Sequence, residues 1–204
     1  MKVYLVANPK GGAGKSTLAT NLAGLLAQRG DARVMLGDVD RQQSAAAWLQ
    51  RRPQATRRIS TWQIEPGKPA RPPAGTTHAV LDTPAGLHAD KLKALLKLAD
   101  RILVPVQPSM FDLLASQAFF AELAEMKAAR GLPVAIVGIR VDERTRAADE
   151  FHRFIETTGL PLLASLRNTQ NYVQLAAHGL SLFDVAPHRV EKDLLQWQPI
   201  SRWL

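Results

Sequence analysis

Residues 10–16 read Lys-Gly-Gly-Ala-Gly-Lys-Ser and constrain the fold of this chain more than any other segment. They follow an apolar stretch at residues 2–7 and precede an amphipathic one at residues 15–29, which predicts a strand, a glycine loop and a helix. Such a loop lets successive backbone N–H groups point at phosphate oxygens, and the N-terminus of the helix adds partial positive charge. Lys15 would then reach the outer phosphates of a nucleotide, and the Ser16 hydroxyl would ligate Mg²⁺.

The loop departs from the ordinary phosphate-loop pattern at one position. That pattern has a glycine five residues before Gly14, where this chain has Pro9, and here a second lysine, Lys10, precedes the glycines. A glycine turn without a ligand is the alternative interpretation. Two lysines beside one tight turn repel each other unless an anion lies near them, which favours a bound phosphate.

Short apolar runs alternate with helical stretches along the chain, a pattern typical of a parallel sheet with crossover helices. We therefore predict an α/β fold, a doubly wound and mainly parallel sheet with helices on both faces, formed by residues 1–204 as one domain. The predicted strands are residues 2–7, 33–37, 78–81, 102–106, 134–139 and 162–165, and the predicted helices are residues 15–29, 44–51, 91–99, 113–130, 147–158 and 169–178.

Residues 53–76 form the least regular segment. Its five prolines exclude a long helix, so we expect a surface excursion with a short strand near residues 58–64. Residues 51–72 also contribute +5 to the formal charge of +8. Such charge attracts polyanions, nucleic acid or an anionic membrane surface among them, although it also serves solubility. The charged residues of this segment are Arg51, Arg52, Arg57, Arg58, Lys68 and Arg71, against Glu65.

Composition excludes several classes of protein. The chain has no cysteine, so it can form no disulfide, zinc–thiolate site or thiol nucleophile. No apolar run approaches the roughly 18 residues that span a bilayer, and the first apolar stretch is too short for a signal peptide. We therefore expect a cytoplasmic protein.

Three aspartates follow predicted strands. Asp82 ends a buried strand and is placed to bind Mg²⁺ directly or through water, with a helix-capping role as the alternative. Asp38 and Asp40 lie two residues apart at another strand end, so one would help to hold the water shell of the metal while the other orients the attacking water. Their spacing does not say which is which, and a plain turn is also open.

These motifs resemble those of the ParA/MinD ATPases, which carry a deviant Walker A loop. Residues 10–17 look like that loop, residues 38–42 (Asp-Val-Asp-Arg-Gln) like the second motif of the family, and residues 81–86 like its Walker B and switch region. Residues 104–109 are similar to the strand and loop that follow in the ParA branch. The resemblance implies a P-loop NTPase fold, ATP and Mg²⁺ as cofactors, and slow hydrolysis to ADP and phosphate. The absence of an Asn-Lys-x-Asp motif disfavours GTP.

The resemblance also implies a role for each site residue. Asp40 positions the attacking water, and Lys10 reaches across a dimer to the phosphates of the partner; screening of its own nucleotide is the alternative for Lys10. The implied catalytic residues are Lys10, Lys15 and Asp40; the ATP-binding residues are Lys10, Gly11, Gly12, Ala13, Gly14, Lys15, Ser16 and Thr17; the magnesium ligands are Ser16, Asp38 and Asp82.

The partners follow from the ParA branch, in which an ATP-bound dimer binds DNA non-specifically and a cargo adaptor stimulates hydrolysis. The resemblance thus implies an ATP-dependent homodimer that positions DNA or another large cargo and associates with the nucleoid when ATP is bound. Lysine and arginine contacts to phosphates would supply the DNA binding. The candidates are Arg167, Arg189, Lys192 and Arg202, with the arginines of residues 51–71.

A MinD-like ATPase that associates with the membrane through a C-terminal amphipathic helix is the competing interpretation. Residues 192–204 carry apolar side chains, but Pro199 interrupts them and lysines are few, so we expect the tail to dock on the body. An enzyme that primes a second substrate with ATP is disfavoured because no acceptor motif is found. A nucleotide sensor that barely hydrolyses is disfavoured by the presence of Lys10 and Asp40.

Overall fold

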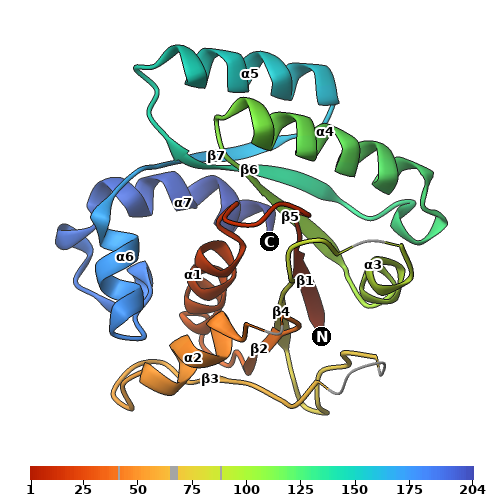
Figure 1. The fold of residues 1–204 in the computed structure, drawn as a ribbon. Coiled ribbons are helices and arrows are strands. Elements are labelled where there is room, and N and C mark those ends of the chain that lie inside the picture. Colours follow the sequence, from red (N-terminus) through yellow and green to blue (C-terminus); the bar gives the residue numbers. More distant parts are fainter. Residues whose placement is uncertain (41, 65–68, 88) are drawn as a thin grey trace.

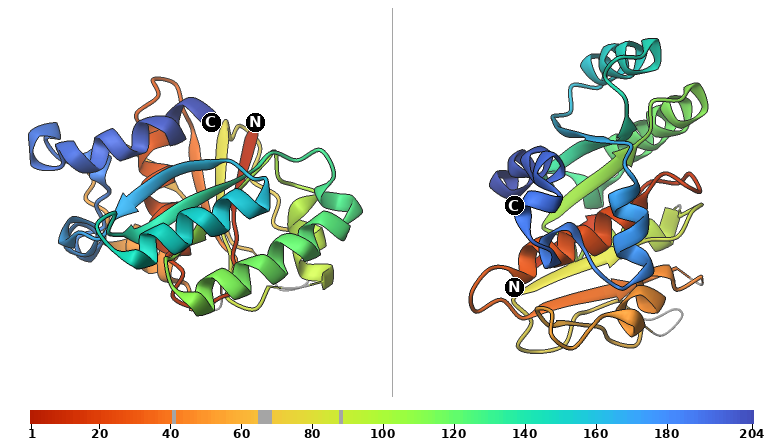
Figure 2. Two further views of the ribbon diagram at one scale, coloured as in Figure 1. Left: turned by 90° about the horizontal axis from the view of Figure 1, so that it is seen from above. Right: turned by 90° about the vertical axis from the view of Figure 1, so that its left-hand side faces the viewer.

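A computed structural model describes residues 1–40, 42–64, 69–87 and 89–204, and its described strands form one parallel sheet (Figures 1 and 2). The strand order is β3-β2-β4-β1-β5-β6-β7, with every described neighbour pair parallel. The predicted α/β fold is thereby confirmed. The strands are β1 (Lys2–Val6), β2 (Val34–Asp38), β3 (Ile59–Ser60), β4 (His78–Asp82), β5 (Arg101–Val106), β6 (Val134–Val141) and β7 (Leu162–Arg167).

Helices cover both faces of the sheet, because each parallel crossover needs a helix to bury the apolar face of its strands. Helices α1, α2, α6 and α7 lie on one side of the sheet and α3, α4 and α5 on the other (Figure 1). One core contains side chains of α1, α2 and α7, with α6 packed against it, and the other contains side chains of α3, α4 and α5. The helices are α1 (Lys15–Ala27), α2 (Ser44–Arg51), α3 (Ala89–Leu96), α4 (Met110–Glu125), α5 (Arg146–Thr158), α6 (Gln170–Ala177) and α7 (Glu191–Trp203).

The predicted elements shift where a local cap decides the boundary. The helix expected over residues 113–130 begins at Met110, because the Ser109 hydroxyl accepts the Asp112 backbone N–H and caps it. It ends at Glu125 and is followed by the 3-10 turn η1 (Lys127–Ala129). The strand expected over residues 58–64 is confined to Ile59–Ser60. Residues 65–68 of that segment, which include Glu65 and Lys68, lie outside the described residues, as does Arg41 of the second motif.

The C-terminal tail docks on the body as expected, but the prediction that Pro199 interrupts it is wrong. Helix α7 runs through Pro199 to Trp203. Trp197 is 1% exposed and Ile200 is buried, so packing on both sides of the exposed proline compensates for its missing N–H donor. Among the described residues, no helix is both long and apolar enough to cross a membrane.

A buried aspartate fastens α7 to its neighbours. Asp193 is fully buried, and its carboxylate accepts hydrogen bonds from the guanidinium of Arg167, the last residue of β7, and from the Asn171 amide of α6. Trp197 of α7 adds a 3.0 Å hydrogen bond from its indole Nε1 to the Tyr172 hydroxyl. Helix α7 is therefore joined to α6 and to the end of β7 by polar contacts as well as by apolar packing.

Arg52 belongs to the fold and not to a free basic surface. Its guanidinium forms a bidentate pair with Asp184, at 2.7 and 2.8 Å, and the two side chains are 6% and 1% exposed. It also donates to the carbonyls of Arg57 and Gly179 and lies 5.0 Å from the centre of the Trp48 ring. One of the arginines proposed for DNA binding is thus committed to an internal ion pair.

Replacing Arg52 with alanine should lower the free energy of unfolding by about 3–5 kcal/mol, because Asp184 would keep a buried charge without its partner. Urea denaturation at pH 7 measures the change. The neighbouring Arg51→Ala is the matched control, since Arg51 is exposed, and it should change stability by no more than about 0.5 kcal/mol. Equal losses for the two variants would contradict the structural role of the pair.

Candidate functional site

The glycine loop follows β1 and ends at the first residue of α1. Gly14 is the N-cap of α1 and has φ 90°, a conformation that favours glycine. A Cβ at this position would lie 2.9 Å from the Cγ2 atom of Ile139 on β6. The close approach of the loop to β6 therefore needs a residue without a side chain.

Two side chains outside the glycine motif hold the loop. The Asn8 side chain is buried; its Oδ1 accepts the Lys10 N–H at 2.8 Å and its Nδ2 donates to the Pro105 carbonyl at 2.8 Å. The Gln107 amide donates to the Gly12 carbonyl at 2.6 Å. Sequence reasoning did not single out either residue as part of the site. The position of Asn8, between an apolar strand and a glycine turn, could have indicated its role in the loop. Gln107 lies far from the loop in sequence, so no local pattern indicated its contact with Gly12.

Lys15 is buried at the base of the loop. Its ammonium Nζ donates to the Lys10 carbonyl at 2.7 Å. Burial lowers the pKa of Lys15, while the nearby Asp82 and Asp40 carboxylates act in the opposite direction. The predicted phosphate-binding lysine therefore lies within the electrostatic reach of two of the predicted acidic residues.

The register of the sheet brings the other strand ends to the same place. Asp82 is paired with Val6 of β1 on one side and with Asp38 of β2 on the other. Both oxygens of the Asp82 carboxylate are buried and accept no hydrogen bond from the described residues. Burial raises the pKa of Asp82 to about 7; the Ser16 hydroxyl lowers it, Asp38 raises it and Lys15 lowers it.

An unsatisfied buried carboxylate beside a serine hydroxyl fits a hard divalent cation. Oxygen ligands of this kind suit Mg²⁺, which commonly keeps several waters and completes its shell with substrate phosphates. No group of three or more His, Cys, Asp or Glu side chains able to hold a metal occurs among the described residues. The residues present therefore fit a magnesium ion brought together with a phosphate ligand, rather than one caged by protein alone.

Asp38 and Asp40 differ in their surroundings. Strand β2 ends at Asp38, whose two carboxylate oxygens accept the backbone N–H groups of Asp40 and Ala46, each at 3.0 Å. Burial raises the pKa of Asp38, and these backbone donors oppose that shift. Asp40 lies beyond the strand and lines the cavity of the glycine loop. The two carboxylates therefore have different positions. Asp38, at the end of β2, accepts a hydrogen bond from the first turn of α2, whereas Asp40 faces the cavity.

Lys10 is held by an aspartate of α4. Its Nζ atom lies 2.5 Å from the Oδ2 atom of Asp112, which also accepts the Ser109 hydroxyl. The Asp112 side chain is 5% exposed, whereas 34% of the Lys10 side chain remains exposed. Asp112 therefore anchors the lysine within its own subunit while leaving it accessible at the rim.

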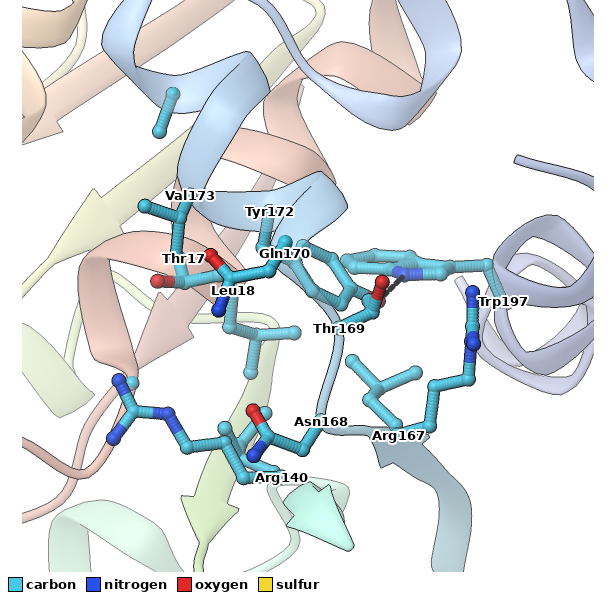
Figure 3. A pocket seen from close by; sticks show the side chains of 14 residues that line it. Thr17, Leu18, Arg140, Arg167, Asn168, Thr169, Gln170, Tyr172, Val173 and Trp197 are labelled. Carbon is cyan, nitrogen blue, oxygen red and sulfur yellow. Dashed lines mark hydrogen bonds between the residues drawn. The ribbon is translucent and has the colours of Figure 1, made fainter. Parts of the chain in front are cut away.

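Two adjoining cavities open at this edge of the sheet. One, of about 510 Å³, contains residues 11–17 with Asp40 and Arg140. The other, of about 520 Å³, lies between α1, α6 and the ends of β6 and β7, where Leu18, Tyr172 and Trp197 contribute to its wall (Figure 3). Both are lined by Gly14, Thr17 and Arg140. Together they offer a phosphate site that adjoins a chamber of similar size, lined by both apolar and polar side chains.

The four residues predicted to bind DNA do not have equal surroundings. Arg167 is paired with the buried Asp193 and lines the second cavity. Arg189, Lys192 and Arg202 are exposed, on the 3-10 turn η3 (Pro187–Arg189) and on α7. The structure therefore groups the last three on one C-terminal segment and separates Arg167 from them.

Comparison with known proteins establishes the family. Residues 4–182 match the CobQ/CobB/MinD/ParA nucleotide binding domain. The chain belongs to this family. The resemblance of its motifs to ParA/MinD ATPases is thereby confirmed, and the matched domain is a nucleotide-binding one.

Similar proteins span nearly the whole chain. Maintenance of carboxysome distribution protein A of Gloeobacter kilaueensis is 33% identical over 189 residues, which cover 89% of this chain and 83% of that protein. The protein of the same name from Halothiobacillus neapolitanus is 31% identical, with 88% and 86% covered. A putative plasmid partition protein of Borrelia burgdorferi bound to AMPPNP has a TM-score of 0.77 at 16% identity, with 100% and 99% covered, and therefore shares the fold.

The raised pKa of Asp82 predicts a pH-dependent stability. In the folded state this carboxyl keeps its proton up to about pH 7, whereas the unfolded state loses it near 3.8. The folded state thus binds the extra proton between these values, so the contribution of this group falls as pH rises from about 4 to 7. Asp82→Asn, which stays neutral, should melt at a higher temperature than the wild type at pH 8, and this difference should be clearly smaller at pH 5.

Thermal melting in EDTA without nucleotide measures this difference. The exposed Asp31→Asn serves as the control and should shift the melting temperature equally little at both pH values. A difference between Asp82→Asn and wild type that is the same at pH 5 and pH 8 would show that Asp82 titrates normally.

Proposed function

We propose that this protein is a magnesium-dependent ATPase of the ParA type whose ATP-bound dimer positions a large cargo. The observation that carries the proposal is the buried, unsatisfied Asp82 carboxylate beside Ser16, at the edge of a preformed glycine loop with a second lysine. Membership of the CobQ/CobB/MinD/ParA family supports the nucleotide-binding part of it.

ATP would occupy the two adjoining cavities. The loop amides and Lys15 would hold the phosphates, and the nucleoside would extend past Thr17 into the second cavity, where Leu18 and Tyr172 offer apolar surface. Asn168 and Gln170 line the same cavity and offer hydrogen-bonding groups to the base (Figure 3). This placement assigns base-binding residues that the sequence motifs alone leave open.

Hydrolysis would then be a matter of positioning and charge. A bound Mg²⁺ would neutralise charge on the outer phosphates, held by Ser16 and Asp82 with Asp38 near its water shell. Asp40 faces the loop cavity and would orient the attacking water. Lys15 would stabilise charge that develops on the phosphates.

Dimerisation is supported by the surface next to Lys10. Three apolar side chains of the first turns of α4 are exposed: Met110 by 61%, Phe111 by 76% and Leu114 by 54%. They flank Asp112, the residue that holds Lys10. Burial of this patch against a second copy would favour release of Lys10 from Asp112 toward the phosphates of the partner.

The positive surface of the C-terminal segment would supply non-specific DNA binding. Arg189, Lys192 and Arg202 are exposed, whereas Arg52 and Arg167 are paired with Asp184 and Asp193. We propose that these three residues, which lie on one C-terminal segment, make the DNA contacts; the exposed Arg51, Arg57, Arg58 and Arg71 stay further candidates. The protein would be cytoplasmic and would associate with the nucleoid when ATP is bound. A cargo adaptor would stimulate hydrolysis and so release it from the DNA.

The similar proteins bear on the cargo. Two are named for carboxysome distribution and are 33% and 31% identical to this chain, while the plasmid partition protein is 16% identical. A large protein assembly is therefore favoured over a plasmid. A membrane-associated mode of the MinD kind is disfavoured because α7 turns Trp197 and Ile200 into the core, where they are unavailable to lipid.

Phosphate release and sedimentation test the ATPase and the dimer together. Asp40→Ala should bind ATP and sediment as a dimer with ATP and Mg²⁺, but should hydrolyse ATP at least about 100-fold more slowly, because it lacks the residue that orients the water. Lys15→Ala should lose ATP binding, and Lys10→Ala should bind ATP as a monomer. A purely monomeric Asp40→Ala protein under these conditions would refute the ATP-dependent dimer.

DNA binding is tested by a triple variant in which Arg189, Lys192 and Arg202 become alanine. If each residue contacts one phosphate, the slope of log K against log salt should become less steep by roughly 3 relative to the ATP-bound wild type. The exposed Arg130, Arg144 and Arg153 give a triple control with the same loss of charge. Equal slopes for the two triple variants, or pelleting of the wild type with anionic liposomes but no DNA shift, would contradict this assignment.

A further inference from the structure

Arg140 has a backbone conformation that its side chain does not favour. It lies near the end of β6 with φ 57°, in the left-handed region. The register between β6 and β7 shifts between Ile139 and Val141, which marks a bulge at this residue. Non-glycine residues held in this region cluster at functional sites, so the presence of an arginine here suggests a function for its side chain.

The bulge itself has a packing role. Ile139 belongs to the core on the α1 face of the sheet and Val141 to the core on the other face. Strict alternation would put both on the same face, so the bulge at Arg140 lets each enter its own core. Glycine or asparagine would serve the same backbone at lower strain. Packing explains the bulge but not the guanidinium.

The position of Arg140, between the two cavities, suggests what its side chain does. It lines both the cavity of the glycine loop and the adjoining cavity beside Tyr172. Ile139, its neighbour in sequence, is also the residue that a Cβ at Gly14 would strike. In Figure 3 the Arg140 side chain extends away from Trp197, on the side of the cavity where Thr17 lies. Arg140 thus lies at the junction between the phosphate site and the nucleoside chamber.

The guanidinium is also uncommitted. Arg140 is exposed, and its guanidinium forms no hydrogen bond or ion pair with any residue that the structure describes. Arg52 and Arg167, by contrast, are each fixed by a buried aspartate. An exposed cation at the rim of an anion site, with all its donors free, can bind two phosphate oxygens at once.

We propose that Arg140 binds the inner end of the nucleotide, at the α-phosphate, within its own subunit. The inference rests on the proposed function, because it needs a nucleotide that spans both cavities. The charge of the α-phosphate changes little when the outermost phosphate is transferred to water, so Arg140 stabilises the bound substrate and the transition state alike. It therefore sets nucleotide affinity and not the rate of the chemical step.

The test uses Arg140→Gly, which removes the guanidinium and suits the left-handed backbone. Its melting temperature should equal or exceed that of the wild type. The affinities for ATP, ADP and AMP, measured by competition with a fluorescent ATP analogue, should all fall by about 10-fold, as expected for the loss of a charge-assisted contact. At saturating ATP, kcat should change less than threefold.

Further variants and ligands make the outcome decisive. Arg140→Asn should behave like Arg140→Gly, and Arg130→Gly, at another exposed arginine, should leave all three affinities unchanged. A loss confined to ATP would place Arg140 at the outer phosphate or across a dimer and would overturn the proposal, as would unchanged affinities. If the wild type itself binds no ATP, the proposed function fails instead, which separates the two results.

Discussion

The parallel register of the central strands is the constraint on which the site depends. Val6 of β1, Asp82 of β4 and Asp38 of β2 stand side by side at one edge, because buried parallel strands with helical crossovers all end there. The glycine loop leaves this edge from β1. A loop that presents N–H donors, a buried carboxylate and a second acidic turn therefore meet without any of them being close in sequence.

This arrangement gathers unfavourable electrostatic interactions at one edge of the sheet. The Asp82 carboxylate is buried and accepts no hydrogen bond from the residues that the structure describes, Lys15 is buried near it, and Asp38 adds a second negative charge. Each of these features costs stability in the isolated chain. Each would be relieved by a bound cation and triphosphate, so the residues that lower stability here are the ones proposed to bind the ligand.

Patterns local to the sequence predicted most of the fold and the centre of the site. Apolar runs located the main strands, and the glycine, lysine and serine spacing located the loop, because these depend on neighbouring residues. Side chains whose partners are remote were not predictable: Arg52 meets Asp184, 132 positions away, and Asn8 meets Pro105, 97 away. The sequence did not predict the helix through Pro199, because tertiary packing of Trp197 and Ile200 outweighs the local cost of proline. It did not predict the bulge at Arg140 either, because the bulge depends on Ile139 and Val141 packing into cores on opposite faces of the sheet.

The buried Asp193 has a consequence for how the two ends of the molecule communicate. Asp193 accepts hydrogen bonds from Arg167 and Asn171, and Trp197 donates one to Tyr172. These bonds join α7 directly to the wall of the second cavity, which Arg167 and Tyr172 line. A ligand that displaces that wall must also move the C-terminal helix or break these bonds. Linkage is reciprocal, so a partner that bound α7 and shifted it would change the affinity of the cavity by the same free energy by which a cavity ligand would change the affinity for that partner. Through Trp197, α7 itself forms part of the wall of the second cavity.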